Sequence, residues 1–399
     1  MDKLAIDGGK PVRDTFLPFH RPNIGKEEED EVIDTLRSGW LTKASKTIEF
    51  EKMFADYCEV KHAVGLINCT AGLHLALIAL NVGKGDEVIT TPMTFAATAN
   101  SIVNVGATPV FVDIDPTTLN IDTGKIEEKI TERTKAILPV HFSGQPCEMD
   151  DIVSLAKEYG LVVIEDAAHA VGTIYKGRKV GGIGDASVFS FYANKNMTTG
   201  EGGMLTTNND ETAEKVSILS LHGLSADAWK RFYVKGFKHY DVLYPGYNYH
   251  MFDIQASLGI HQLKKVDKLW ENRKRIVDIY NGSFEEFPEI SLIPQIPREG
   301  SRNSYYLYII ALRIEKLRAT RDMIASALQA ENIGVGVHYK AVHLQPYYRR
   351  SFGFEEGQFP TTEYYSERVI SLPLFPTLTD DDVGSVVSAV KKVVSFYKS

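Results

Sequence analysis

The stretch that decides the fold is Leu161-Val162-Val163-Ile164-Glu165-Asp166. A short apolar run that ends in acidic residues predicts a buried strand with a carboxylate at its carboxyl end. Similar apolar runs bounded by turn-forming residues occur, with helix-length segments between most of them, at 63–67, 86–90, 108–112, 135–140 and 186–191. This alternation predicts an α/β fold with a mostly parallel sheet over about residues 60–220.

The pattern changes after about residue 255. A long charged helix is predicted from Leu258 to about Phe287, then a strand-like run at 305–310, a helix near Thr320 to Glu331 and a terminal helix after Thr379. We therefore expect a large cofactor-binding domain at 1–255 and a small C-terminal α+β domain at 256–399.

Two reactive side chains fall at the carboxyl ends of predicted strands. Asp166 ends the strand at 161–166, and Lys195 lies in the loop after the strand at 186–191, just before the turn-rich segment 198–203. A lysine can hold pyridoxal phosphate as a Schiff base, while a carboxylate against the pyridine nitrogen keeps that nitrogen protonated. The pair predicts a pyridoxal phosphate site. Taken alone, Lys195 would be interpreted as a surface charge, and Asp166 as a strand-end cap or a surface carboxylate.

The cofactor's phosphate also has a candidate seat. Small residues connect the strand at 63–67 to the helix at 73–80, in the segment Asn68-Cys69-Thr70-Ala71-Gly72. A helix that begins in this way offers free backbone N–H groups and the positive end of its dipole to an anion.

Further motifs follow in a fixed order along the chain. They are Ser38-Gly39-Trp40-Leu41-Thr42, Pro92-Met93-Thr94-Phe95, His141-Phe142-Ser143-Gly144-Gln145-Pro146, Glu165-Asp166-Ala167-Ala168-His169-Ala170 and Gly246-Tyr247-Asn248-Tyr249. With these motifs the chain, from about Leu17 to about Phe375, resembles the sugar-nucleotide aminotransferases of the DegT/DnrJ/EryC1/StrS family. The resemblance implies a fold-type I aminotransferase, whose large domain holds a mostly parallel sheet of the seven-stranded type.

The resemblance also implies a role for individual residues. Lys195 would carry the cofactor and shuttle the proton, and Asp166 would hold the pyridinium. The other cofactor contacts would be Thr70, Ala71 and Ser190 at the phosphate, Phe95 on the ring face, His169 near the 3′-hydroxyl, and Asn248 at the phosphate of the neighbouring subunit's cofactor. Substrate contacts would come from Trp40, Thr42, His338 and Tyr339. The role of Asn248 implies a homodimer with shared active sites.

Several of these residues also have an ordinary structural interpretation. Ser190 could pair locally within its strand, Phe95 could be a core residue, and His169 could be a hydrogen-bonded core histidine. Asn248 could be a turn residue after Pro245-Gly246.

The chain departs from the family pattern at three places. It has Lys43-Ala44-Ser45 where many relatives continue Thr-Gly-Pro, His250 where many have Arg or Lys, and Asn194 before the lysine. Because of the first departure, the loop beside the sugar can differ from that of the relatives. The second departure leaves open which cation, if any, binds the carboxylate of the amino donor or the phosphate of the cofactor. Relatives that dehydrate sugars carry His in place of the lysine, so Lys195 favours transamination.

The expected reaction is transfer of an amino group from L-glutamate to a nucleotide-linked 4-keto-deoxy sugar. UDP is the expected nucleotide, and the product would enter cell-envelope polysaccharide such as lipopolysaccharide. One alternative is a sugar dehydratase or a desulfurase of the same fold, although a desulfurase needs a mobile reactive cysteine and Cys69 lies in the phosphate turn. The other alternative is a non-catalytic, cofactor-binding regulatory protein.

Composition agrees with a globular enzyme. The net charge of -8 argues against a broad nucleic-acid-binding surface, and 44% hydrophobic with 24% charged residues is a globular mixture. Cys58, Cys69 and Cys147 are too few and too scattered for a disulfide framework or a metal cluster. The chain has no signal-peptide pattern at its start and no apolar run near the roughly 18 residues that span a bilayer. We expect a cytoplasmic protein without a bound metal.

Overall fold

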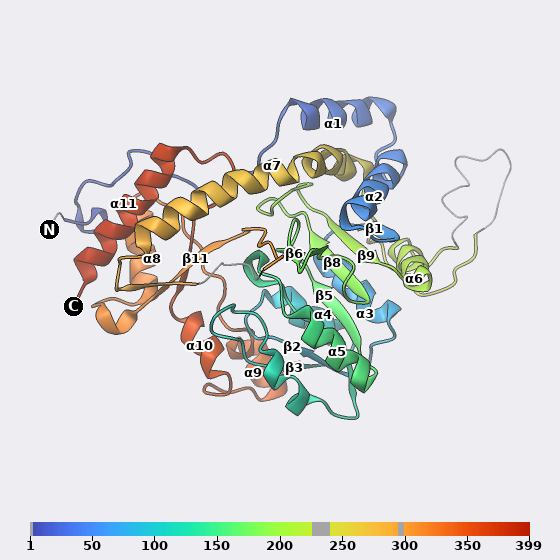
Figure 1. Ribbon diagram of the computed structural model, residues 1–399. Coiled ribbons are helices and arrows are strands. Elements are labelled where there is room, and N and C mark those ends of the chain that lie inside the picture. The colour runs from blue at the N-terminus through green and yellow to red at the C-terminus, as the bar shows by residue number, and fades with distance from the viewer. Residues whose placement is uncertain (1–2, 226–239, 294–298) are drawn as a thin grey trace.

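The computed structural model describes residues 3–225, 240–293 and 299–399. Its centre is a seven-stranded sheet with the order β1-β9-β8-β5-β4-β2-β3 (Figure 1). Only β9 runs antiparallel to its neighbours β1 and β8, which confirms the predicted mostly parallel sheet. The strands are β1 His62–Leu66, β2 Glu87–Thr90, β3 Thr108–Phe111, β4 Thr134–Ile137, β5 Val162–Asp166, β8 Ala186–Ser190 and β9 Gly203–Thr207.

Helices cover both faces of this sheet. On one face lie α3 (Cys69–Ala79), α4 (Ala96–Asn104) and α6 (Asp210–Ser220), and on the other lie α2 (Ser45–Cys58), α5 (Met149–Tyr159) and the start of α7 (Asp253–Phe284). Successive strand residues point to opposite faces, so Ile164 packs with α3 while Val163 packs with α5. By the same rule Asp166 shares the face of Ile164, and Glu165 shares the face of Val163.

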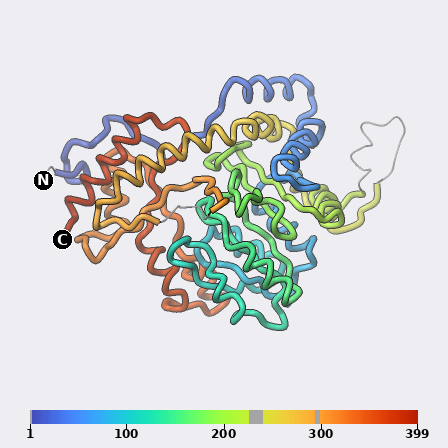
Figure 2. The backbone as a smooth tube through the Cα atoms, in the orientation of Figure 1, coloured from blue at the N-terminus to red at the C-terminus, as the bar shows by residue number. Residues whose placement is uncertain are grey.

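The long helix α7 runs from the large sheet to a second, smaller layer, and α1 (Lys26–Ser38) lies along it (Figure 1). The smaller layer is an antiparallel sheet of β10 (Ile290–Leu292), β11 (Tyr308–Leu312) and β12 (Val369–Leu372), covered by α8 (Arg321–Ala330) and α11 (Asp380–Tyr397). Both termini lie beside this layer (Figure 2). Leu4 and Leu17 are buried in its core, and the expected division after residue 255 falls just inside α7.

The remaining elements are short. They are the hairpin β6 (Ile174–Tyr175) and β7 (Arg178–Lys179), helices α9 (Pro346–Phe352) and α10 (Pro360–Ser366), and the 3-10 turns η1 (Ala5–Asp7), η2 (Thr123–Lys125), η3 (Glu127–Lys129), η4 (Phe142–Gly144), η6 (Ile314–Lys316) and η7 (Val342–Leu344). Within the residues that the structure describes, no helix combines the length and apolar character that a membrane span requires.

Several element boundaries differ from the sequence expectation, and two of the differences have a clear physical cause. Helix α7 begins at Asp253, five residues early, because the Gln255 side chain accepts from the backbone N–H of Phe252 and caps the first turn. Strand β11 begins at Tyr308 and not at 305, because Tyr305 has a left-handed backbone with φ 51° and its N–H donates to the Asn303 side chain.

Candidate active site

A cavity of about 410 Å³ opens at the carboxyl ends of β5 and β8. The N-termini of α3 and α4 form one side of it, and residues 338–339, between α8 and α9, form another. This is the edge of an open α/β sheet at which ligands bind. The cavity is lined by Asn68, Cys69, Thr70, Leu73, Thr94, Phe95, Ala97, Thr98, Val140, Asp166, Ala168, His169, Ser190, Tyr192, Asn194, Lys195, Glu201, Tyr306, His338 and Tyr339.

The carboxylate of Asp166 lies at the floor of the cavity and is buried. It accepts hydrogen bonds from the Thr98 hydroxyl at 2.7 Å and from the backbone N–H of Ala168 at 3.1 Å. Burial raises the pKa of Asp166, and these two hydrogen bonds oppose the rise. A cationic partner in the cavity would oppose it further and would hold the carboxylate ionised.

The amine of Lys195 faces the same cavity from the loop after β8. Its Nζ lies 4.3 Å above the ring centre of Tyr306, within range of a cation–π contact. Burial lowers the pKa of Lys195 to about 8, although the charge of Asp166 favours the protonated form. An amine with a pKa near the working pH can act as a nucleophile and can exchange protons.

Aromatic side chains form the remaining wall. His169 Nε2 lies 3.1 Å from the hydroxyl of Tyr339, and the His169 ring packs against Tyr306 at 4.3 Å between ring centres. Phe95 lines the cavity although its side chain is 61% exposed, so its flat face is available to a ligand. His338 bonds through Nδ1 to the Ser371 hydroxyl at 2.8 Å, and burial lowers the pKa of His338 to about 4.

The N-terminus of α3 is the seat that the sequence predicted for a phosphate. Asn68 caps the helix, and its side-chain oxygen accepts the N–H of Ala71 at 2.8 Å. Thr70 and Ser190 line the cavity, whereas Ala71 does not. The N–H of Ala71 therefore becomes available to an anion only if the Asn68 side chain turns away.

Besides Ala71, three predicted residues do not line the cavity of their own chain. Trp40, Thr42 and Asn248 are all exposed and lie outside it. Two of the departures lie close to them in the sequence. Lys43 forms an ion pair with Glu51 at 2.8 Å, and His250 is largely buried, with no hydrogen-bond partner for its Nδ1 among the described residues.

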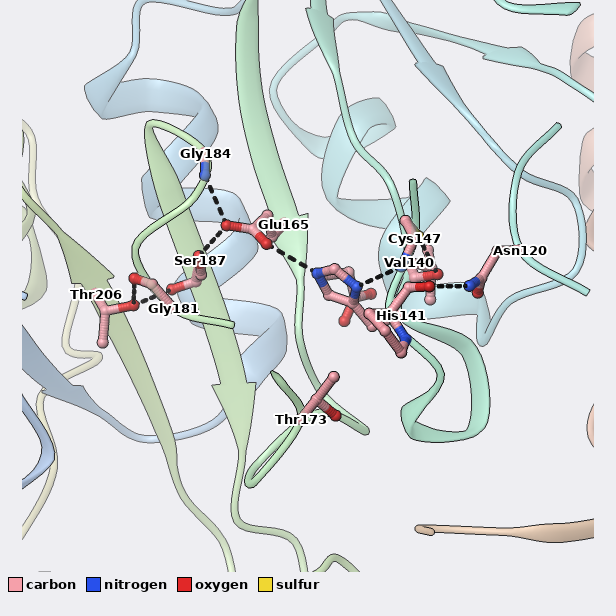
Figure 3. Close-up of polar contacts among 12 residues, drawn as sticks. Asn120, Val140, His141, Cys147, Glu165, Thr173, Gly181, Gly184, Ser187 and Thr206 are labelled. Carbon is pink, nitrogen blue, oxygen red and sulfur yellow. Dashed lines mark hydrogen bonds and ion pairs between the residues drawn. The ribbon is translucent and has the colours of Figure 1, made fainter. Parts of the chain in front are cut away.

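A polar network built on the buried side chains of Glu165, His141 and Ser187 lies on the other face of the sheet (Figure 3). Glu165 accepts from the Ser187 hydroxyl at 2.7 Å and from the Gly184 N–H at 2.8 Å, and lies 2.9 Å from His141 Nε2. His141 Nδ1 accepts the N–H of Cys147 at 3.1 Å, so its Nε2 carries the proton given to Glu165. These hydrogen bonds together outweigh burial, which is the largest single influence, and lower the pKa of Glu165.

This network also fixes the backbone of Asp166. The backbone N–H of His141 donates to the carbonyl of Asp166 at 3.1 Å, and the N–H of Asp166 donates to the carbonyl of Pro139 at 2.9 Å. Sequence reasoning gave no role to Glu165, His141, Thr98 or Tyr306. Two of the quoted motifs contain His141 and Glu165, and Thr98 lies one helical turn after Phe95, so the positions of these three residues were an available signal. Nothing in the sequence near Tyr306 pointed to the cavity.

The residues present fit pyridoxal phosphate. One cavity brings together a lysine with a lowered pKa, a buried carboxylate, a helix N-terminus beside Thr70 and Ser190, and an aromatic face. Each group matches one part of the cofactor: the aldehyde, the ring nitrogen, the phosphate and the ring face. Within the described residues no cluster of His, Cys, Asp and Glu is arranged to hold a metal ion.

Comparison with known proteins gives one consistent result. The DegT/DnrJ/EryC1/StrS aminotransferase family matches residues 22–391. The chain is 51% identical over 383 residues to the spore coat polysaccharide biosynthesis protein SpsC of Bacillus subtilis, covering 96% of this chain and 98% of that protein.

Solved structures of two similar proteins agree with this result. The PLP-form of Spr1654 from Streptococcus pneumoniae superposes with a TM-score of 0.87 at 36% identity, covering 96% of this chain and 99% of that one, and its PMP-form superposes equally well. PseC of Helicobacter pylori, an aminotransferase involved in the biosynthesis of pseudoaminic acid, superposes with a TM-score of 0.89 at 31% identity, covering 96% of this chain and 100% of that one.

Proposed function

This chain belongs to the DegT/DnrJ/EryC1/StrS aminotransferase family, and we propose that it moves the amino group of L-glutamate onto the keto carbon of a nucleotide-linked sugar. The proposed sugar is a 4-keto-deoxy sugar carried by UDP, and the proposed product enters cell-envelope polysaccharide, such as lipopolysaccharide. The observation that carries the proposal is the pairing of Lys195 with Asp166 in one cavity. The names of SpsC and PseC support a role in the making of amino sugars for polysaccharides and related glycans.

Pyridoxal phosphate, when bound, supplies an electron sink and a temporary carrier for the amino group. Asp166 would hold the ring nitrogen, with Thr98 fixing one of its carboxylate oxygens. Thr70 and Ser190 would hold the phosphate at the N-terminus of α3, and Phe95 would cover the ring. The neutral amine of Lys195 would take a proton from the donor's carbon and pass it to C4′ of the cofactor, and in the second half of the reaction it would move a proton from C4′ to the carbon of the sugar that receives the amino group.

The charge of the cavity supports a contribution from a second chain. A glutamate donor and a nucleotide diphosphate both bring negative charge, yet the described residues that line the cavity include no arginine. Asn248 is proposed to reach the phosphate of the partner's cofactor, and Trp40 and Thr42 are proposed to contact the sugar there. This arrangement requires a homodimer.

Exposed apolar side chains support this homodimer. They occur in two segments near Asn248 and Thr42, namely Ile33, Leu36, Leu41, Ile48, Val242, Leu243, Tyr244 and Phe252. The two segments adjoin, since the N–H of Asp253 donates to the carbonyl of Thr42. Apolar surface gathered in this way favours association with another chain. The three described cysteines are free and buried, which agrees with the proposed cytoplasmic location.

Absorbance tests the proposed reaction against its rivals. The purified protein loaded with pyridoxal phosphate should change to the amine-form spectrum when L-glutamate is added, and a UDP-linked 4-keto sugar should then restore the original spectrum with a UDP-amino sugar detected by mass spectrometry. A dTDP-linked sugar serves as the control for the nucleotide. A spectrum that does not respond to any amino donor supports the regulatory protein. A deoxygenated sugar or released sulfur supports the dehydratase or the desulfurase.

Subunit mixing tests the shared site. The Lys195→Ala and Asn248→Ala proteins should each be defective at limiting cofactor. In a mixed dimer, the site built on the Asn248→Ala chain has its own Lys195 and borrows an intact Asn248. Exchange of subunits should therefore restore activity toward about half of the wild-type value per dimer. No gain after verified exchange would remove Asn248 from the partner's site.

A further inference from the structure

The turn that follows β4 holds a backbone amide against an imidazole of the active site. Ser143 has φ 58° and ψ 8°, a left-handed conformation that is costly for a residue other than glycine. In this conformation its backbone N–H donates to Nδ1 of His169 at 3.2 Å. Its hydroxyl donates to the carbonyl of Leu307 at 2.9 Å, and its carbonyl accepts the N–H of Tyr306 at 3.2 Å. The hydroxyl and the carbonyl of Ser143 are thus both hydrogen-bonded to the segment that leads into β11.

A backbone amide can only donate, and this fact determines the protonation of His169. Its Nδ1 must present a lone pair to Ser143, so the ring's proton resides on Nε2. A doubly protonated ring would place two donors against each other in a buried site, where a mismatched pair is costly. The Nε2–H therefore donates to the Tyr339 oxygen, which lies 3.1 Å away.

The Tyr339 hydroxyl then has its own proton to give. No acceptor for that proton occurs among the described residues, and Tyr339 lines the cavity. We propose that Ser143 is a positioning residue that fixes His169 as the Nε2–H tautomer, so that His169 holds the Tyr339 hydroxyl as a permanent hydrogen-bond donor to an oxygen of the bound ligand. The ligand oxygen belongs either to the cofactor or to the sugar.

The surroundings keep both side chains neutral. The charged and titratable groups near His169 are Lys195, His338, Tyr306, Tyr339 and Asp166. Burial lowers the pKa of His169, and the positive charges of Lys195 and His338 lower it further. Burial raises the pKa of Tyr339, and Tyr306 and Asp166 add to the rise. His169 therefore acts as a fixed donor and does not exchange protons during the reaction.

The same geometry explains which side chain can replace His169. A glutamine presents an acceptor oxygen and a donor nitrogen on one flat group, so it can accept from Ser143 and donate to Tyr339. Leucine can do neither. Direct removal of the Ser143 amide is not informative, because proline cannot adopt a positive φ and the turn would misfold.

Nitrogen NMR tests the tautomer without any assay of activity. In apoprotein labelled with ¹⁵N at histidine, the signals missing from the His169→Gln protein belong to His169. We expect an unprotonated Nδ1 and a protonated Nε2, both unchanged between about pH 6 and pH 9. A protonated Nδ1, or a ring that titrates in this range, would overturn the proposal.

Variants test the role of the donor toward the ligand, which rests on the proposed function. Tyr339→Phe should weaken binding or turnover by about tenfold, the value of one hydrogen bond. A loss of cofactor affinity in the absence of sugar assigns the ligand oxygen to the cofactor, and a higher KM for the sugar alone assigns it to the sugar. No change in either quantity contradicts the donor role.

Rescue completes the test. His169→Leu should lose activity, and His169→Gln should recover it to about tenfold above His169→Leu while keeping both limbs of the wild-type pH profile. Loss of one limb in His169→Gln would show that His169 exchanges protons. The tautomer measurement stands even if the sugar substrate proves different, so the two proposals fail separately.

Discussion

The hydroxyl of Thr98 offers the sharpest perturbation of the cofactor site. It is fully buried, and it donates to an oxygen of Asp166 at 2.7 Å while lying 2.7 Å from the hydroxyl of Thr94. Since the Thr98 proton goes to Asp166, the Thr94 hydroxyl must donate to Thr98 and strengthen its pull on the carboxylate. Thr98→Val replaces this hydroxyl by a methyl group of nearly the same shape.

The size of the effect follows from the charge of the acceptor. A hydrogen bond to an ionised group contributes about 1.5–3 kcal/mol, which corresponds to about one to two pKa units. The pKa of Asp166, already raised by burial, should therefore rise further by that amount. Because the ionised carboxylate is the useful form, the acidic limb of kcat/KM and of cofactor affinity should move to higher pH by the same one to two units.

The assay compares pH profiles of three proteins: wild type, Thr98→Val and Thr90→Val. Thr90 is the matched control, because its hydroxyl is equally buried but donates to the carbonyl of Leu138 and not to Asp166. Urea unfolding checks that both variants are folded. If the acidic limb of Thr98→Val coincides with that of Thr90→Val, the hydrogen bond does not control Asp166 and the reasoning is refuted.

Three further predictions concern the same site. Asp166→Asn should slow the chemical step in single-turnover experiments by about two to four orders of magnitude, and near-normal turnover would argue against its role at the ring nitrogen. The rate at which apoprotein takes up pyridoxal phosphate should rise with pH around a midpoint of about 8, because only the neutral amine of Lys195 attacks; a flat profile would be inconsistent with the lowered pKa. Glu165→Gln should reduce the free energy of unfolding by about 3 kcal/mol, because the donor NH2 group of the glutamine would face another donor, either the Nε2–H of His141 or the N–H of Gly184. The pKa of Glu165 is lower in the folded protein than in the unfolded chain, so its ionised carboxylate stabilises the fold at pH values above the unfolded pKa. The difference in free energy of unfolding between wild type and Glu165→Gln, measured in urea, should therefore shrink as the pH falls through the folded pKa.

Much of the fold could be predicted from short apolar runs and the segments between them. The strand at 161–166 and its terminal carboxylate are where the pattern indicated, because period and turn residues are local properties of the chain. The exceptions arose where a side chain overrides the pattern, as at Tyr305, where Asn303 captures the backbone N–H and delays β11.

The site was predictable only in its local parts. Lys195 follows a strand and Asp166 ends one, both strands have clear apolar patterns, and the two residues line the same cavity. Thr98 comes from the first turn of α4 and Tyr306 from the segment just before β11, and only tertiary packing brings them to the lysine and the carboxylate. The use of the Ala71 amide by Asn68 likewise depends on one side-chain rotation that the sequence does not determine.

The central claim is that Lys195 carries the cofactor. Borohydride reduces the bond between a lysine and pyridoxal phosphate to a stable amine, and peptide mapping then identifies the lysine. We predict one modified peptide, containing Lys195, in the wild-type protein and its loss in Lys195→Ala, with the folded state of the variant verified by urea unfolding. A modified peptide that contains another lysine, or retention of the adduct in Lys195→Ala, would contradict the account.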